Sequence, residues 1–185
     1  MTIENTTKVG PATPPRAGIA IPTGRYRLLP ELSTVAFTAK KFGVFTIRGT
    51  MCLESGTFTV ASPLEHSRLH AVLSADSFKT PMAKRDAHVK SPTLLDVEAN
   101  PRVEFDSTDV APQPDGTWEV RGLLTVHGQV APAVLAVTSA STEGALVRVR
   151  ATAQVDRRVF GVTALRAAAS SRIDVVIEAV GTPVR

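Results

Sequence analysis

Apolar and polar side chains alternate with a period of two along most of the chain from Tyr26 onward. Successive side chains on a β-strand point to opposite faces, so a run of this kind predicts a strand with one apolar face. The clearest runs cover residues 34–40, 102–106, 118–126, 147–156 and 172–180. Turn signals follow some of these runs, as at Asp115-Gly116 and Glu143-Gly144, which is typical of antiparallel hairpins. The pattern predicts an all-β chain of seven or eight antiparallel strands.

One segment, residues 82–90, breaks this alternation. Its sequence, Met-Ala-Lys-Arg-Asp-Ala-His-Val-Lys, consists mostly of good helix formers, and Pro92 follows shortly after it. Because proline cannot continue a helix, the segment predicts a short helix that ends before Pro92 and bridges two strands. Strands with one interposed helix fit either a sandwich with a filled core or a closed barrel around a cavity. Periodicity alone does not choose between these two architectures.

The first 23 residues carry no alternation and contain Pro11, Pro14, Pro15 and Pro22. Such a segment buries little, so we expect a flexible tail over residues 1–23, one domain over residues 24–181 and a short tail over residues 182–185. Deleting residues 1–22 is then expected to leave folding and binding unchanged. The segment also lacks the run of roughly 7 to 15 apolar residues that a secretory signal needs. A cytoplasmic location is therefore expected.

Composition narrows the class of protein. Hydrophobic residues make up 43% and charged residues 21% of the chain, which is typical of one globular domain rather than of a disordered or membrane-spanning chain. The net charge of +4 is spread along the whole length, without the Lys/Arg run that tracking nucleic-acid phosphates requires. The single Cys52 cannot form an internal disulfide and is too little for a thiolate zinc site.

Groups that could hold a metal or carry out catalysis are few. His66 and His70 are four residues apart, but residues 68–76 alternate as a strand, on which this spacing separates the Cα atoms by roughly 13 Å. We interpret both as surface histidines and predict that chelators leave stability unchanged. No phosphate loop or nucleophile elbow occurs, and no feature brings two carboxylates together. The residues by themselves therefore give no motif for catalysis.

Arg85 and Asp86 are adjacent opposite charges within the predicted helix. Neighbouring helical residues point to different sides, so each needs its own partner. We favour a structural network of ion pairs or caps that fixes the helix to the barrel rim, with contact between Arg85 and the polar head of a ligand as the alternative.

Several motifs resemble the signature of one known family. In order they are Ser77-Phe78-Lys79-Thr80, Arg85-Asp86-Ala87-His88-Val89-Lys90-Ser91, residues 101–108 (Pro-Arg-Val-Glu-Phe-Asp-Ser-Thr), residues 122–128 (Gly-Leu-Leu-Thr-Val-His-Gly) and residues 156–162 (Asp-Arg-Arg-Val-Phe-Gly-Val). Their sequence, order and spacing are similar to those of the YceI family of lipocalin-like barrels. The chain departs from the family pattern at Leu29, Leu32, Lys41 and Val130, where members commonly carry other polar groups.

The resemblance implies an antiparallel eight-stranded lipocalin-like barrel with a short helix between strands, which holds a long-chain polyisoprenoid such as an isoprenoid quinone or a polyprenyl phosphate. A barrel of about this size encloses one slender ligand, and each buried methylene contributes about 0.8 kcal/mol. The resemblance implies a binding protein rather than an enzyme, with no cofactor other than the lipid. Neither nucleic acid nor stable membrane insertion is expected, and a homodimer stays open.

The ligand-binding residues that we expect on the basis of this resemblance fall into three groups. The inward stripes contribute Phe37, Phe105, Trp118, Leu124 and Ala153, and Phe42, Phe45 and Phe160 lie near the loops. A lid or mouth around the helix contains Phe78, Met82, Leu94 and Leu95, with Arg85 placed to meet a polar head.

Two other classes of function stay open. A structural or protein-binding module has a filled core and no cavity, and an enzyme acting on a small apolar substrate needs a polar cluster inside the cavity.

Overall fold

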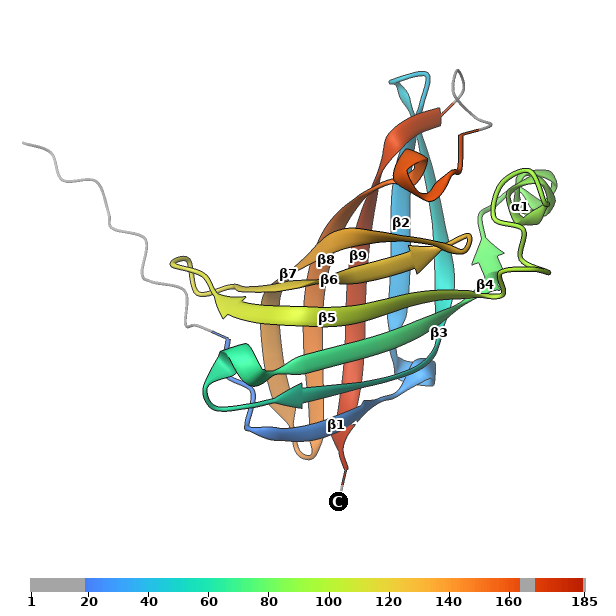
Figure 1. The fold of residues 1–185 in the computed structure, drawn as a ribbon. Coiled ribbons are helices and arrows are strands. Elements are labelled where there is room, and N and C mark those ends of the chain that lie inside the picture. The colour runs from blue at the N-terminus through green and yellow to red at the C-terminus, as the bar shows by residue number, and fades with distance from the viewer. Residues whose placement is uncertain (1–18, 164–168, 185) are drawn as a thin grey trace, which may run out of the picture.

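The computed structural model describes residues 19–163 and 169–184, which form a β-barrel with one short α-helix at its side (Figure 1). The strands are β1 (Gly24–Leu28), β2 (Thr34–Lys41), β3 (Phe45–Val60), β4 (Arg68–Lys79), β5 (Arg102–Pro112), β6 (Trp118–Val126), β7 (Gln129–Glu143), β8 (Leu146–Asp156) and β9 (Ala169–Pro183). Short 3-10 helices occur at η1 (Pro30–Leu32), η2 (Leu64–His66) and η3 (Arg157–Phe160).

Within the described residues the paired strands run antiparallel, and the sheet closes on itself. Consecutive strands pair from β4 through to β9, β9 pairs with β2, β2 pairs with β3, and β3 pairs back with β4. These strands form a closed barrel of eight strands. The fold class expected from the sequence is therefore confirmed, and the open sandwich with two separate sheets is not formed.

Strand β1 does not add a ninth position to the barrel wall. It pairs with the end of β3 around Phe58 and with the end of β9 around Thr182, so it lies between the same two strands as β2. The 3-10 helix η1, which contains Pro30, separates β1 from β2. Because proline has no amide hydrogen to donate to the ladder, this position is occupied by two shorter strands.

The predicted helix is present as α1 (Ala83–Lys90), between β4 and β5. Met82 precedes it in an extended conformation, and the Ser91 amide closes its last turn on the His88 carbonyl. Pro92 follows and cannot continue the helix. The predicted bounds are thus correct to within one residue at the start.

The alternation sorts the barrel residues into inner and outer sets, as strand β8 illustrates. Ala151, Ala153 and Val155 line the interior, whereas Arg150 and Gln154 are exposed. The same register brings Ala153 opposite Val175 of β9, which also lines the interior. The apolar face of each strand is therefore turned toward the barrel axis.

The part of the expected N-terminal tail that the structure describes lies against the barrel. Ile19 packs on the cluster around Phe105, and Ile21 packs on a second cluster that contains Tyr26. The Tyr26 hydroxyl donates a hydrogen bond to the Pro22 carbonyl at 2.8 Å. Residues 19–22 consequently belong to the packed domain, while residues 1–18 of the expected tail lie outside the described residues.

A comparison of two truncations checks these contacts. Deleting residues 1–22 is expected to lower the free energy of unfolding by about 1 to 2 kcal/mol relative to deleting residues 1–18, because two partly buried isoleucines and one hydrogen bond are lost. Urea unfolding of both truncated proteins measures the difference. Equal midpoints would mean that Ile19 and Ile21 contribute nothing to stability.

Candidate functional site

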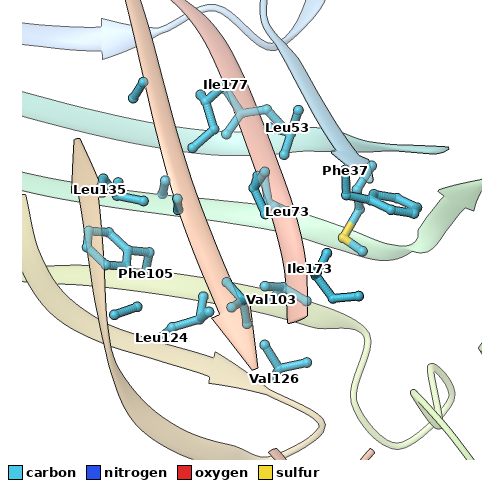
Figure 2. A pocket seen from close by; sticks show the side chains of 18 of the residues that line it. Phe37, Leu53, Leu73, Val103, Phe105, Leu124, Val126, Leu135, Ile173 and Ile177 are labelled. Atoms are coloured by element: carbon cyan, nitrogen blue, oxygen red, sulfur yellow. The ribbon is translucent and has the colours of Figure 1, made fainter. Parts of the chain in front are cut away.

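The barrel encloses one large cavity of about 760 Å³. Its wall consists almost wholly of apolar side chains from the barrel strands, and Figure 2 shows many of them pointing into the same space. The labelled residues are Phe37, Leu53, Leu73, Val103, Phe105, Leu124, Val126, Leu135, Ile173 and Ile177. A volume of this size lies within the range of pockets for small molecules and cofactors. The interior is therefore a cavity rather than a filled core.

Two glycines allow aromatic rings to pack closely against the cavity wall. A Cβ at Gly49 would lie 2.3 Å from a ring atom of Phe37, and a Cβ at Gly122 would lie 2.6 Å from a ring atom of Phe105. A Cβ at either position would also lie 2.5 Å or less from a backbone oxygen, that of Lys79 or that of Asp106. Glycine at these positions therefore allows each ring to lie against the barrel wall.

All but two of the ligand-binding residues expected from the sequence line this cavity. The residues in the lining are Phe37, Phe78, Met82, Arg85, Leu94, Leu95, Phe105, Trp118, Leu124, Ala153 and Phe160. Leu94, Leu95 and Phe160 form a buried apolar cluster with Val162, and Phe78 and Val89 pack against it. This cluster joins the segment after α1 to η3 and borders the cavity.

Phe42 and Phe45 do not line the cavity, so their expected place in its wall is wrong. Strand β2 ends at Lys41, and the turn that follows carries Phe42 away from the barrel with a left-handed backbone (φ 51°). The two rings are 62% and 66% exposed. Alternation predicts that a residue lies near a loop, but it does not predict whether the loop folds over the mouth or projects from it.

Asp86 fixes α1 to the end of β4. The backbone amide of Thr80 and its hydroxyl both donate to Asp86 Oδ1, at 3.0 and 2.7 Å. The hydrogen bond from the Thr80 side chain is the main reason that the pKa of the Asp86 carboxyl lies below its usual value. At the last residue of the helix, Lys90 pairs with Asp76 at 3.3 Å. The expected structural network at α1 is thus built by Asp86 and Lys90.

Arg85 forms no ion pair in that network. In the described part of the chain no carboxylate lies within ion-pair distance of it, and its Nη2 atom lies 3.7 Å from the Met82 sulfur. Its side chain lines the cavity together with Lys84 and His88 of the same helix. One face of α1 therefore presents basic groups to the cavity, while its only acid, Asp86, is held by Thr80.

The polar lining of the cavity is basic in character. Besides the three basic residues of α1, Lys41 of β2, Arg68 of β4 and Arg157 of η3 reach it, and no Asp or Glu of the described residues does. Arg157 is buried and donates to the carbonyls of Val162 and Ser170. Burial is the main cause that lowers the pKa of its guanidinium from the usual value. The cavity consequently suits an apolar ligand with an uncharged or anionic polar end.

Several lining residues were missed from the sequence although their signals were present. Lys84 and His88 are four residues apart on the predicted helix and so share one face with each other. Leu53, Leu73 and Ile177 occupy apolar positions of strands, and the alternation contains them. Arg157 gave no signal in the alternation, because it lies in a 3-10 turn that breaks the period, and only the motif at residues 156–162 contains it.

The histidines are not gathered into a metal site. His70 lies on the outer surface, where its Nδ1 atom is 2.7 Å from Asp106 Oδ1, and His66 is exposed. His127 Nδ1 lies 3.4 Å from the Phe160 carbonyl. Across residues 19–163 and 169–184, no group of three or more metal-ligating side chains occurs, and no helix is long and apolar enough to cross a bilayer.

Asp86 offers a test of how α1 is held. Its pKa is lowered in the folded protein, so its contribution to stability is present above the unfolded value near 3.9 and is lost as pH falls through the folded value. Asp86→Asn is expected to lower the melting temperature at pH 7, with the gap to wild type narrowing as the pH falls below about 4. Thermal melts across this range measure it, with the exposed Glu98→Gln as control. A gap that does not change with pH would assign the loss to geometry rather than charge.

The chain forms a closed β-barrel around one apolar cavity, with basic side chains at one helix, and barrels of this class enclose one small ligand when their interior is not filled by side chains. Within that class the family is clear. The model of the YceI-like domain matches residues 26–181, and the chain belongs to this family. The resemblance read from the sequence motifs is thereby confirmed.

Relatives by sequence are bacterial proteins described as UPF0312 proteins. The chain is 36% identical over 105 residues to one from Pseudomonas syringae pv. tomato, which covers 56% of this chain and 55% of the relative. A relative from Vibrio cholerae is 30% identical over 105 residues, with the same coverage. The chain thus aligns with about half the length of these curated relatives.

Solved structures share the fold at low sequence identity. BcnA of Burkholderia cenocepacia superposes with a TM-score of 0.74 at 16% identity, covering 84% of this chain and 99% of BcnA. A polyisoprenoid-binding domain of Saccharophagus degradans, implicated in plant cell wall breakdown, gives 0.65 at 14% identity, covering 86% of this chain and 98% of that domain. A mutant YceI protein of Campylobacter jejuni gives 0.60 at 16% identity, covering 73% and 85%.

Proposed function

We propose that this protein binds one long-chain polyisoprenoid lipid in its barrel and carries or stores it without chemical change. The observation that carries the proposal is the apolar cavity of about 760 Å³ inside the closed barrel. A cavity of this kind in water is empty or poorly hydrated, and an apolar ligand of matching shape fills it favourably. The description of the Saccharophagus degradans neighbour as a polyisoprenoid-binding domain supports the same class of ligand.

The wall suits a methyl-branched chain. Branched and aromatic side chains such as Val103, Phe105 and Ile177 line the tube from several strands, and they offer contact on all sides without a polar partner to satisfy. Each methylene buried contributes about 0.8 kcal/mol, so a few isoprene units offset much of the 4 to 15 kcal/mol lost in translational and rotational freedom. Most of the binding free energy is therefore expected to come from burial of the lipid's isoprenoid tail.

The polar end of the lipid lies at α1 in this proposal. Lys84, Arg85 and His88 present their side chains to the cavity there, with no carboxylate among the described lining residues to neutralise them. Both lipid types that the family resemblance implies fit the apolar tube, but only a polyprenyl phosphate carries the charge that this face complements. We therefore favour a polyprenyl phosphate over an isoprenoid quinone.

Organic extraction of the purified protein followed by mass spectrometry tests the class of ligand. The expected result is a polyisoprenoid in amounts approaching one per chain. A titration of delipidated protein with geranylgeraniol then tests uptake directly. Finding neither extracted isoprenoid nor geranylgeraniol binding overturns the proposed function.

A matched pair of ligands tests the head group. Geranylgeranyl phosphate is expected to bind wild type about tenfold more tightly than geranylgeraniol, and the double variant Lys84→Gln/Arg85→Gln is expected to remove this preference. Lys90→Gln is the control, because Lys90 carries the same charge on the same helix but pairs with Asp76 outside the cavity lining. Equal affinity of wild type for the two ligands would favour the quinone type instead.

A further inference from the structure

The turn between β2 and β3 exposes large apolar side chains that have no place in the cavity. Val44, Phe45 and Phe42 are 75%, 66% and 62% exposed, and they are the three most exposed large hydrophobic residues of the described chain. They lie within four consecutive positions. A cluster of exposed apolar side chains of this kind marks a surface that contacts a protein or a membrane when the protein functions. We call residues 40–45 the β2–β3 tip.

The β2–β3 tip and the first residues of β3 beside it are also basic. Between residues 32 and 53 the chain contains Lys40, Lys41 and Arg48 and no Asp or Glu. Lys41 Nζ lies 5.3 Å from the centre of the Phe42 ring, and Lys40 Nζ donates to the Thr46 hydroxyl at 2.8 Å. No carboxylate of the described residues pairs with any of these three cations.

The strands on either side leave this charge uncompensated near the turn. Strand β3 has no acid before Glu54. On β9 the acid nearest the tip is Asp174, which lies opposite Thr38 and accepts a hydrogen bond from Gln154. The tip therefore presents aromatic and aliphatic side chains flanked by cations, a combination that fits the headgroup region of an anionic bilayer.

The position of the tip connects it to the cavity. Figure 1 shows the β2–β3 hairpin projecting beyond the barrel at the end opposite to the chain's C-terminus. Lys41, at the base of the tip, lines the cavity, and Phe42 immediately after it is exposed. A membrane that receives the tip would thus lie next to the cavity wall at the same end.

We propose that the β2–β3 tip docks this protein on the surface of an anionic membrane, with Phe42, Val44 and Phe45 in the headgroup region and Lys40, Lys41 and Arg48 facing anionic lipids. Docking in this proposal is peripheral and reversible, because only a single turn inserts. This docking role is separate from the binding of a lipid in the barrel. It would allow that lipid to pass between the bilayer and the cavity without crossing water.

Vesicle sedimentation with the full chain tests the surface. The protein is expected to bind vesicles of equal parts phosphatidylcholine and phosphatidylglycerol, and to bind pure phosphatidylcholine vesicles roughly tenfold less. Phe42→Ser/Phe45→Ser is expected to weaken binding to the mixed vesicles by about tenfold or more. Lys40→Gln/Arg48→Gln is expected to remove the preference for the anionic vesicles.

Leu32→Ser/Val184→Ser is the matched control. Both residues are exposed and apolar. Leu32 comes just before β2 and Val184 just after β9, at the ends of these strands away from the β2–β3 tip, so the control is expected to bind mixed vesicles like wild type. Geranylgeraniol uptake by every variant is measured in parallel without vesicles. Wild-type uptake in the Phe42→Ser/Phe45→Ser variant shows that its barrel is intact, and absence of uptake in wild type concerns the proposed function and not the docking surface.

Three results would overturn the proposal. The first is that wild type does not sediment with the mixed vesicles, and the second is that Phe42→Ser/Phe45→Ser sediments with them as well as wild type does. The third is that analytical ultracentrifugation finds wild type to be a dimer and the double Ser variant to be a monomer, while both bind vesicles equally. In that case the tip is covered by a second copy of the chain.

Discussion

Replacing Ala153 by Trp is expected to abolish uptake of a long isoprenoid while leaving the empty barrel nearly as stable as wild type. Ala153 lies on β8, lines the cavity and faces the space that the lipid chain would fill. The indole enters a void of about 760 Å³, so it does not have to displace neighbouring side chains. In a filled core the same change would cost about 1 to 3 kcal/mol through overpacking.

Two measurements decide this prediction: the melting temperature of the lipid-free protein and a titration with geranylgeraniol. Thr152→Trp is the control, because Thr152 is adjacent in sequence, is absent from the cavity lining and points to the opposite face of β8. It is expected to keep wild-type uptake. A large fall in melting temperature for Ala153→Trp would mean that the space around Ala153 is occupied by protein.

Phe160→Ala is expected to cause the largest loss of stability, about 3 to 5 kcal/mol. Phe160 is 2% exposed and packs with Leu94, Leu95 and Val162 in the cluster that joins η3 to the segment after α1. Removing its ring deletes these contacts and leaves a space that the surrounding short turns cannot fill.

Urea unfolding of lipid-free protein measures the Phe160→Ala effect without a contribution from ligand. Val159→Ala is the control from the same 3-10 helix, since Val159 is 57% exposed, and its effect should stay within about 0.5 kcal/mol. Similar losses for the two variants would show that the cluster around Phe160 does not stabilise this end of the barrel.

The sequence by itself determined which residues face the cavity along most strands, and where the helix α1 lies. The alternation in residues 147–156 was sufficient to place Ala151, Ala153 and Val155 inside, because a strand has a strict period of two. The helix formers of residues 82–90 and the following Pro92 predicted α1 to within one residue. Both signals are local, so they survive without knowledge of the rest of the fold.

The closure of the barrel and the cavity inside it were decided by tertiary structure. The same alternation of apolar and polar residues occurs in a strand that faces a filled core and in one that lines a hollow barrel. Only the pairing of β3 with β4 and the volume left between opposite walls distinguish the two. The family resemblance, rather than periodicity, pointed to the hollow barrel.

The ends of the barrel were the least predictable part. Phe42 and Phe45 read as wall residues, but the turn after β2 projects them into solvent. Arg85 and Asp86 read as one structural network, but only Asp86 is held by Thr80, while Arg85 lines the cavity. A period fixes which face of a strand is apolar, whereas the direction of a turn and the partner of a charge depend on residues far away in the sequence.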